Sequence, residues 1–492
     1  MEKYILSIDQ GTTSTKAILF DKNGDAKYIS QKPLDLIYPN SGWVEVNAKD
    51  IWVSVVNAIT ELFISNNISF KNIDSIGITN QRETTIIWDK ATGEPVYNGI
   101  VWQSRQSADI CDALSDKKDF IHKKTGLLIN PYFSASKIRF ILDKIPNGQA
   151  RAENGELMFG TVDTWIIYRM TNKTIHATDV SNASRTMLMN INTLEWDKEL
   201  CDLFNIPLCI LPEIKPSSYR YGVVSAFGSK VEICGVAGDQ QAALFGQNCF
   251  KEGDTKNTYG TGCFMLMNIG DKVKLSNNGL LTTVAWQIGD KVAYALEGSV
   301  FIGGAVIQWC RDQMKLLTYA SESEDYAKAC CNSKNKLFVV PAFVGLGTPY
   351  WDDQARGAVF GITRNTSREE FVKACLEGIC YQCKDVFEIM KEEAKMPLND
   401  LRVDGGSTAN KYLLQFQADI MECDISLPKC LETTALGACY LAGLASGYFS
   451  SIQEIKNIHD IQAKYHNNMS KDKVDELYSY WKKAVEATRM FK

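Results

Sequence analysis

The 492-residue chain has the composition of an ordinary folded protein. Hydrophobic residues make up 45% of the sequence, charged residues make up 23%, and the formal net charge is −5. This balance excludes both the strongly basic surface that nucleic acids require and the low hydrophobicity of a disordered chain. The length is sufficient for two large domains with a cleft between them. We therefore expect a folded protein that has no nucleic-acid partner.

The start of the chain and its cysteines both indicate a cytoplasmic protein. The first apolar run, Tyr4 to Ile8, reads as a strand rather than a secretory leader, and no apolar run is long enough to span a bilayer. The fifteen cysteines are odd in number and scattered, which suits a reducing compartment. Cys380 and Cys383 form a CxxC pair inside a helical pattern, so we expect them to pack in a helix rather than bind metal. We expect no membrane association.

An acid, a glycine and four hydroxyl residues separate the first two apolar runs. They form the segment DQGTTSTK, Asp9 to Lys16, between Tyr4 to Ile8 and Ala17 to Phe20. A tight turn after a strand exposes consecutive N–H groups to an anion, and Asp9 can hold a metal-bound water. The segment therefore predicts a phosphate-binding hairpin with ATP as its ligand, and a solvated hairpin tip is the alternative.

Strand-like runs alternate with amphipathic helical runs along the chain, which indicates an α/β protein. The predicted strands are Tyr4 to Ile8, Ser75 to Thr79, Thr85 to Trp88, Glu232 to Val236, Phe264 to Asn268, Val292 to Leu296 and Lys336 to Pro341. The predicted helices are Ile51 to Ile64, Ser136 to Leu142, Val300 to Met314 and Arg368 to Ala394. Ser367 and Glu370 form a capping box that marks the start of the last helix.

A second hairpin pattern suggests that the chain has two duplicated halves. The segment YGTGC, Tyr259 to Cys263, again places glycine and threonine before a predicted strand. We place the boundary near Asn248, which divides the chain into residues 1–248 and 249–492.

The predicted ATP site is not of the Walker or protein-kinase type. The sequence contains neither GxxxxGK[ST] nor a GxGxxG followed by a VAIK lysine. A third glycine-rich element, DGGSTAN from Asp404 to Asn410, lies between the strand-like Leu401 to Val403 and the helical Tyr412 to Ile420. Its glycines would let a nucleotide lie against backbone at the positive end of a helix, and a simple strand-to-helix turn is the alternative.

Six segments together resemble the FGGY family of carbohydrate kinases, over residues from about 3 to about 448. They are DQGTTSTK at Asp9 to Lys16, NQRETT at Asn80 to Thr85, GTVDTW at Gly160 to Trp165, AGDQQAALFG at Ala237 to Gly246, TYGTGCF at Thr258 to Phe264 and RVDGG at Arg402 to Gly406. The resemblance implies two actin/hexokinase-like (ribonuclease H-like) α/β domains that flank a catalytic cleft. The first would hold glycerol, phosphate and the catalytic base, and the second would hold the adenine nucleotide. The implied activity is ATP-dependent phosphorylation of glycerol to sn-glycerol 3-phosphate and ADP, which begins glycerol catabolism and supplies a glycerolipid precursor.

Phosphoryl transfer to an alcohol needs a base for the hydroxyl proton. Asp239 follows the predicted strand Glu232 to Val236 in a glycine turn, from which its carboxylate would project into the cleft, and the resemblance points to the same residue. A turn former or helix cap is the alternative.

A triol needs charged hydrogen-bonding partners for its oxygens and an apolar wall for its carbons. Arg82 and Glu83, which would otherwise be read as an exposed ion pair, match the glycerol-binding motif of the family. The resemblance assigns Trp102, Tyr132 and Phe264 to the wall and the polyol contacts, and it adds Gln240 to the polyol site. Without the resemblance, these aromatic residues would be read as core.

The resemblance also assigns the nucleotide and metal ligands. Thr12, Thr13, Ser14 and Lys16 would hold phosphates from one lobe and Thr261 from the other, with Gly304, Gln308, Gly406 and Asn410 on the adenosine side. Asp9, through water, and Asp239 would hold Mg²⁺. Lys16 stands where many relatives have Arg, so a forked phosphate contact becomes a point charge. The segment Ala226 to Val231 is shorter than the loop by which some bacterial relatives bind fructose bisphosphate, so that regulation is not carried over.

Two other functions compete with glycerol phosphorylation. A kinase of a pentulose or another polyol belongs to the same class, and NQRETT argues against it. An actin- or Hsp70-like ATPase is permitted by the fold alone. Relatives that are dimers or tetramers imply a homodimer or homotetramer.

Overall fold

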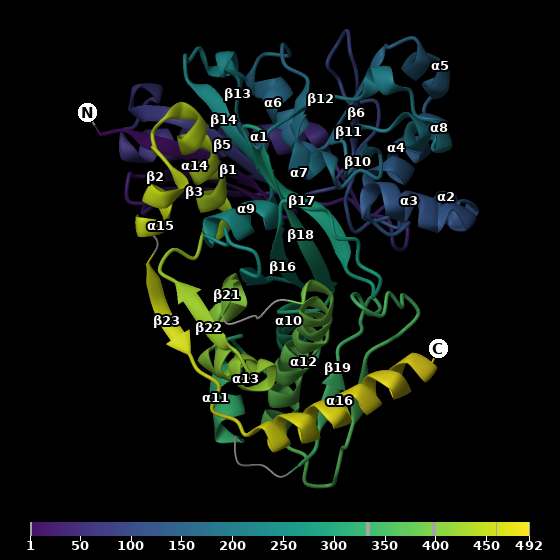
Figure 1. Ribbon diagram of the computed structural model, residues 1–492, viewed down its shortest axis with the longest axis vertical. Helices are drawn as coiled ribbons and strands as arrows, with labels where there is room; N and C mark the ends of the chain where they lie inside the picture. Colours follow the sequence, from purple (N-terminus) through teal and green to yellow (C-terminus); the bar gives the residue numbers. More distant parts are fainter. Residues whose placement is uncertain (1, 331–334, 396–399, 459, 492) are drawn as a thin grey trace.

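A computed structural model describes residues 2–330, 335–395, 400–458 and 460–491. A sheet with thirteen strands in these residues runs through the centre of the molecule (Figure 1). From edge to edge its strands are β23 (Ile461–Tyr465), β22 (Asp424–Pro428), β21 (Asp400–Asp404), β15 (Thr255–Tyr259), β16 (Cys263–Gly270), β18 (Lys291–Val300), β17 (Leu281–Ile288), β13 (Ser218–Val223), β14 (Glu232–Gly238), β5 (Ile73–Asn80), β1 (Tyr4–Gln10), β2 (Ser14–Phe20) and β3 (Ala26–Pro33).

The two halves of this sheet have the same topology. In the first half, β14, β5 and β1 are parallel, while β1, β2 and β3 are antiparallel neighbours. In the second half, β22, β21 and β15 are parallel, while β15, β16 and β18 are antiparallel neighbours. The repeat predicted from the two hairpins is therefore present in the fold. A single residue pair, Ser218 with Ile288, joins β13 to β17 and so connects the halves.

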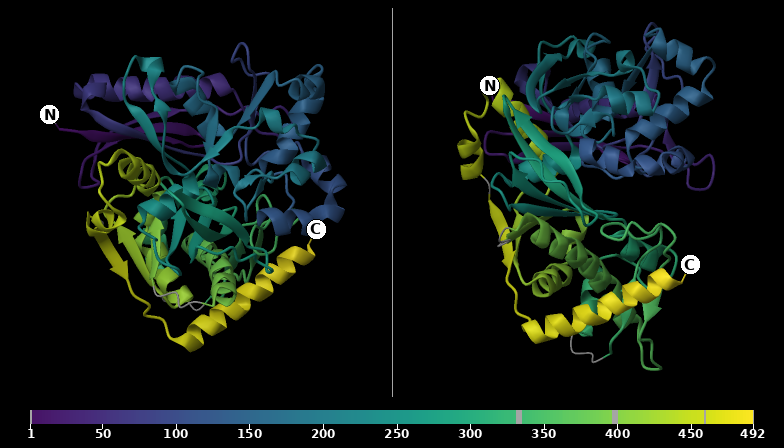
Figure 2. Two further views of the ribbon diagram at one scale, coloured as in Figure 1. Left: turned by 45° about the horizontal axis from the view of Figure 1, so that its top comes forward. Right: turned by 45° about the vertical axis from the view of Figure 1, so that its right-hand side comes forward.

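Long helices cover the outside of each half. α1 (Ala48–Asn66) packs on β2 and β3, and α12 (Arg368–Ala394) packs on β16 and β18. α12 begins at the predicted residue because Ser367 and Glu370 form the expected capping box. α16 (Lys471–Met490) lies across the lower end of the second half (Figure 2).

Apart from β13, which lies in the sheet, the residues between β5 and β14 form an additional layer, part of which has a hydrophobic core of its own that includes Phe133, Phe159 and Leu188. Its helices are α2 (Ala108–Ala113), α3 (Lys118–Thr125), α4 (Ser134–Lys144), α5 (Gly148–Glu153), α6 (Val162–Met170), α7 (Val180–Ala183) and α8 (Lys198–Leu203). Its strand pairs are β6 (Ile86–Asp89) with β8 (Leu157–Gly160), β9 (Ala177–Asp179) with β12 (Glu213–Lys215), and β10 (Met189–Asn190) with β11 (Glu195–Trp196), and its β7 (Gly99–Ile100) pairs with β4 (Glu45–Val46). This layer carries several of the predicted polyol residues.

Two helices cross between the halves. α9 (Asp239–Gly246) follows β14 of the first half but contacts β15, β16 and β17 of the second. α14 (Thr433–Ser446) follows β22 of the second half but lies on β1, β5 and β14 of the first (Figure 1). The two helices contact each other and share one hydrophobic core with strands of both halves.

Glycines allow the backbones of α9 and α14 to touch. A Cβ atom at Gly437 would lie 1.8 Å from the carbonyl oxygen of Ala242, and one at Gly246 would lie 2.0 Å from the carbonyl oxygen of Thr433. Gly77 on β5 and Gly235 on β14 likewise leave room for the backbone of α14. Since close-packed interiors tolerate no such overlap, this crossing requires glycine at these positions.

The predicted strands and helices are present, with one clear error. The helix expected from Val300 to Met314 starts too early, because Val300 ends β18 and α10 (Ala305–Asp312) begins five residues later. Gly303 and Gly304 hold the intervening turn against the second hairpin by donating to the carbonyl oxygens of Thr261 and Gly260.

Three further predictions concern a strand, a helix and the domain boundary. The strand expected from Lys336 to Pro341 is shortened to β19 (Phe338–Val340), which pairs with β20 (Ala358–Phe360). α13 (Lys411–Met421) follows β21 as expected. The division into residues 1–248 and 249–492 stays a prediction, because α14 returns to the first half.

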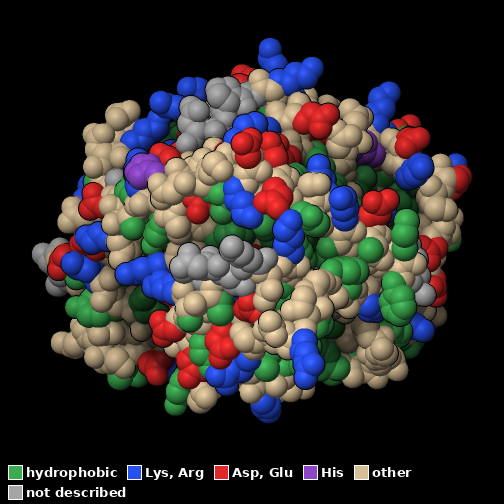
Figure 3. Space-filling model, turned by 90° about the horizontal axis from the view of Figure 1, so that it is seen from below, with side chains coloured by type: hydrophobic (Ala, Val, Ile, Leu, Met, Phe, Trp, Pro, Cys, Tyr) green, Lys and Arg blue, Asp and Glu red, His purple; other side chains and the backbone are tan. Residues whose placement is uncertain are grey.

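Three further observations concern membrane-spanning helices, cysteines and surface charge. Within the described parts of the chain, none of the helices combines the length and the apolar character needed to cross a membrane. The described cysteines are free, and Cys380 and Cys383 are buried in α12. Figure 3 shows positive and negative side chains interspersed on the lower face, in line with the small net charge.

Because the backbones of α9 and α14 touch where they cross, we predict that Gly437→Ala destabilises the protein. Helix propensity alone favours alanine over glycine by about 1 kcal/mol, whereas overpacking against the backbone of α9 costs about 1–3 kcal/mol or more. We expect a lower free energy of unfolding and a lower thermal midpoint. Thr434→Ala, at a half-buried position of the same helix, is the control and should change stability by less than about 0.5 kcal/mol. A Gly437→Ala variant as stable as the unchanged protein would contradict the close contact.

Candidate active site

The site begins with Arg82 and Glu83, which follow β5 and are both buried. The Nε atom of Arg82 lies 3.8 Å from Oε1 of Glu83 and 3.2 Å from Oδ1 of Asp239. Glu83 has a φ of 59°, an uncommon conformation for a non-glycine residue. Its carbonyl oxygen accepts hydrogen bonds from the hydroxyls of Thr85 and Ser134, which hold it in place. Strained backbone of this kind concentrates at functional sites.

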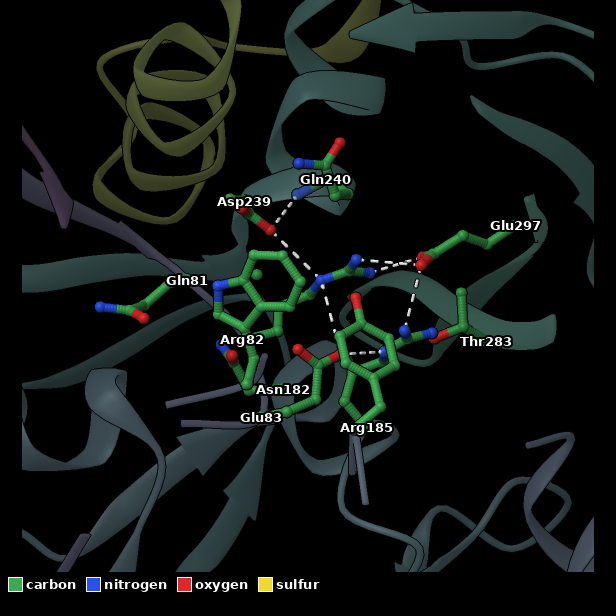
Figure 4. Close-up of polar contacts among 12 residues, drawn as sticks. Gln81, Arg82, Glu83, Asn182, Arg185, Asp239, Gln240, Thr283 and Glu297 are labelled. Atoms are coloured by element: carbon green, nitrogen blue, oxygen red, sulfur yellow. Dashed lines mark hydrogen bonds and ion pairs between the residues drawn. The ribbon is translucent and has the colours of Figure 1, made fainter. Parts of the chain in front are cut away.

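Two buried partners complete a network of charges around Arg82 (Figure 4). Glu297, on β18, accepts from Nη1 of Arg82 at 2.5 Å and from Nη2 at 3.0 Å. Arg185, which follows α7, donates to Glu83 at 2.6 Å and to Glu297 at 3.0 Å. Burial raises the pKa of Glu83. Burial opposes ionisation of Glu297 too, but the guanidinium groups of Arg185 and Arg82 outweigh it and lower its pKa to about 2.

Asp239 is the first residue of α9, directly after the glycine that ends β14. Its side chain is 31% exposed, while the groups around it are buried. Its Oδ1 accepts from the backbone N–H of Gln240 at 2.7 Å. A carboxylate that is fixed by an arginine and a backbone N–H, yet open on one side, has the arrangement that a general base needs.

A chain of buried hydrogen bonds supports the turn before Asp239. The N–H of Gly238 donates to Oγ of Ser181, and Ser181 donates to Asp179. Asp179 caps α7, and burial raises the pKa of its carboxyl group. A Cβ atom at Gly238 would lie 2.7 Å from Cγ and Cδ of Arg82, so glycine also lets Arg82 pass beside the turn.

The three predicted aromatic residues meet at one place. The ring centroid of Trp102 lies 5.6 Å from the ring centroid of Tyr132 and 6.3 Å from that of Phe264, and both pairs have edge-to-face geometry. Trp102 and Tyr132 come from the layer between β5 and β14, and Phe264 comes from β16 of the second half. The guanidinium of Arg185 lies over the ring of Tyr132 at 5.6 Å, which joins the aromatic group to the charge network.

The two glycine- and threonine-rich hairpins approach each other through Trp102. Its Nε1–H donates to Oγ1 of Thr12 in the first hairpin at 2.9 Å, and its ring contacts Phe264 next to the second hairpin. In the described residues we find no protein acceptor for the N–H groups of Thr12, Thr13 and Thr261. Free N–H groups on facing turns can receive phosphate oxygens.

Lys16, in the first half of the protein, forms an ion pair with a glutamate of the second half. Its Nζ lies 2.8 and 2.7 Å from the two carboxylate oxygens of Glu432, next to the start of α14. Glu432 therefore partly compensates its charge, and a contact of Lys16 with phosphate stays a prediction. Nearby, burial raises the pKa of Asp9 to about 7.

The acidic groups fit Mg²⁺ held mainly through water and phosphate. In the described residues no cluster of three or more His, Cys, Asp or Glu side chains is suited to caging a metal ion. Mg²⁺ typically uses one or two carboxylates together with substrate phosphates, and the partly buried carboxyl of Asp9 would supply such an oxygen ligand.

On the nucleotide side, glycines bring three segments together. A Cβ atom at Gly304 would lie 2.7 Å from Oγ of Ser407, and one at Gly405 would lie 2.5 Å from the carbonyl oxygen of Tyr259. Gly406 has open space beside it, and Gln308 is exposed on α10. The side chain of Asn410 caps α13 and donates to Ser323, so its amide is already engaged.

Sequence reasoning missed three buried charged residues of the site. They are Arg185, Glu297 and Lys256, whose Nζ donates to Gln240 at 2.5 Å and to Thr258 at 2.8 Å. Burial lowers the pKa of Lys256 to about 8. For Glu297, a single charge directly after the apolar run Val292 to Leu296 is a signal in the sequence, whereas Arg185 and Lys256 have no comparable signal.

Comparisons with known proteins identify the family of the chain. Profiles of the FGGY family of carbohydrate kinases match residues 4–246 with the N-terminal domain and residues 255–446 with the C-terminal domain. A Bacillus licheniformis protein named glycerol kinase is 54% identical over 100% of both chains. A Staphylococcus haemolyticus protein of the same name is 52% identical over 100% of this chain and 99% of its own.

Solved structures show the same fold. A Plasmodium falciparum glycerol kinase solved with ADP superposes with a TM-score of 0.92 at 38% identity, covering 99% of this chain and 98% of that one. A Lactobacillus acidophilus xylulose kinase superposes with a TM-score of 0.87 at 25% identity, with coverage of 99% and 98%. The predicted two-domain α/β fold is confirmed, and the chain belongs to the FGGY family of carbohydrate kinases.

Proposed function

We propose that this chain is a glycerol kinase, which transfers the γ-phosphoryl group of ATP to glycerol and releases sn-glycerol 3-phosphate and ADP. Full-length relatives at 52–54% identity carry that name. The observation that carries the proposal is the position of Asp239, which faces Arg82 beside the aromatic group and near both hairpins.

In this mechanism, Arg82, Glu83 and Gln240 bind the hydroxyl groups of glycerol, while Trp102, Tyr132 and Phe264 contact its carbons. Asp239 accepts the proton of the attacking hydroxyl as the new P–O bond forms.

The nucleotide lies between the two hairpins. N–H and hydroxyl groups of Thr12, Thr13, Ser14 and Thr261 hold its phosphates, while Gly304, Gln308, Gly406 and Asn410 surround the adenosine. Lys16, which also pairs with Glu432, contributes positive charge near these phosphates. Asp9, through water, and Asp239 would hold Mg²⁺, which when bound neutralises phosphate charge. A cytoplasmic location and a dimeric or tetrameric state stay predictions.

A substrate panel tests the function. ADP release should depend on glycerol and should be much slower with xylulose or ribulose at equal concentration. Preference for a pentulose would replace the proposal with the alternative within the same class. ATP hydrolysis that is indifferent to every polyol would favour an actin- or Hsp70-like ATPase.

Asp239→Asn should remove most of the activity. Loss of a general base lowers kcat by about 10²–10⁴-fold, and KM for ATP should rise as well because Asp239 is also proposed to hold Mg²⁺. Steady-state kinetics with glycerol measure both. Asp290→Asn, in the exposed turn between β17 and β18, is the control and should keep normal kinetics. A near-normal rate for Asp239→Asn would show that the base is another group.

Gly238→Ala should weaken glycerol use selectively. The added methyl group would displace the side chain of Arg82, so we expect KM for glycerol to rise about 10-fold or more, since small displacements have large kinetic effects. KM for ATP serves as the internal control. Equal increases in both KM values would indicate general disruption instead.

A further inference from the structure

Glu297 is a buried carboxylate that reaches the site from the second half of the protein. It lies on β18, whereas Arg82 follows β5 of the first half. Both oxygens of Glu297 accept from the two Nη atoms of Arg82, and Oε1 also accepts from Arg185 (Figure 4). The side chains of all three residues are almost fully buried.

The contact with Glu297 fixes the direction in which Arg82 points. A guanidinium is planar, so two bonds along its Nη edge determine where its Nε–H is aimed. That Nε atom lies 3.2 Å from Asp239. The edge of Arg82 that meets the catalytic carboxylate is therefore set by the carboxylate behind it.

The charges around Arg82 show why its orientation is important for Asp239. Asp239 and Glu83 are the other carboxylates near it, and Lys256 and Arg185 carry positive charge. Glu297 stays ionised in neutral solution because the two arginines lower its pKa to about 2 against the effect of burial. If Glu297 were neutral, the Nη groups of Arg82 would lack their counter-charge. The partly exposed Asp239 would then be free to turn toward them, and its proton-accepting oxygens would be occupied.

We propose that Glu297 is a positioning residue for the phosphoryl transfer, because it holds Arg82 and Arg185 so that Arg82 offers one N–H edge to Asp239 and leaves that carboxylate able to accept a proton. This inference rests on the proposed function. Because the two partners belong to different halves, the polyol site is complete only when the halves are together.

The test is Glu297→Gln, which keeps the shape of the side chain and removes its charge. We expect kcat with glycerol to fall about 100-fold and KM for glycerol to rise about 10-fold, as in other displaced active-site groups. KM for ATP should stay within about twofold, because the hairpins are not altered. Glu297→Asp keeps the charge on a shorter side chain and should recover part of kcat.

The control is Asp385→Asn in α12, another buried carboxylate, which accepts from Tyr350, Tyr478 and Trp481. It should lower the thermal midpoint but keep both KM values and kcat. Normal kcat and glycerol KM in folded Glu297→Gln would overturn the inference, as would losses that follow stability in both variants alike. If Glu297→Gln does not fold, Glu297→Asp decides, since unchanged kinetics there would also overturn it. An unmodified protein that fails to phosphorylate glycerol would instead reject the proposed function.

Discussion

The contact between α9 and α14 is the constraint on which the rest of the structure depends. Each helix follows the sheet of one half and packs on the other, and glycines let the two backbones touch. Both helices also begin at the site, α9 with Asp239 and α14 beside Glu432, which holds Lys16. Their N-terminal ends bring partial positive charge to the region where phosphate is proposed to bind. One packing contact therefore joins the cores and brings Asp239 and Glu432 to the candidate site.

The sequence predicts the local parts of this protein well, because their signals are local. The hairpins, the capping box at Ser367 and the strand before Asp239 all depend on neighbouring residues. The role of Glu297 could not be assigned in this way, because its partner Arg82 lies 215 positions away and an acid within a strand does not specify that partner. The early start given to α10 has a similar cause, since the turn at Gly303 and Gly304 is held by the distant second hairpin.

The buried charged side chains around Arg82 need partners of opposite charge. Burying ionised groups is costly unless each is paired and hydrogen-bonded, and removal of one partner leaves an uncompensated charge. Arg82, Arg185, Glu83 and Glu297 meet most of this condition by binding one another, although Nη1 of Arg185 has no partner within the described residues, and Asp239 is the member of the group that keeps access to solvent. The network therefore contributes orientation more than stability. It leaves one carboxylate available, beside the aromatic residues that are proposed to receive the substrate's carbons.

The narrow connection between β13 and β17 has a mechanical consequence. Elsewhere in the sheet, neighbouring strands share several residue pairs, so each half behaves as a stiff plate. At the seam only Ser218 and Ile288 are paired, so bending there disturbs a single rung of the ladder. Bending along this seam would therefore change little of the strand ladder, and α9 and α14, which pack on both halves, limit its extent.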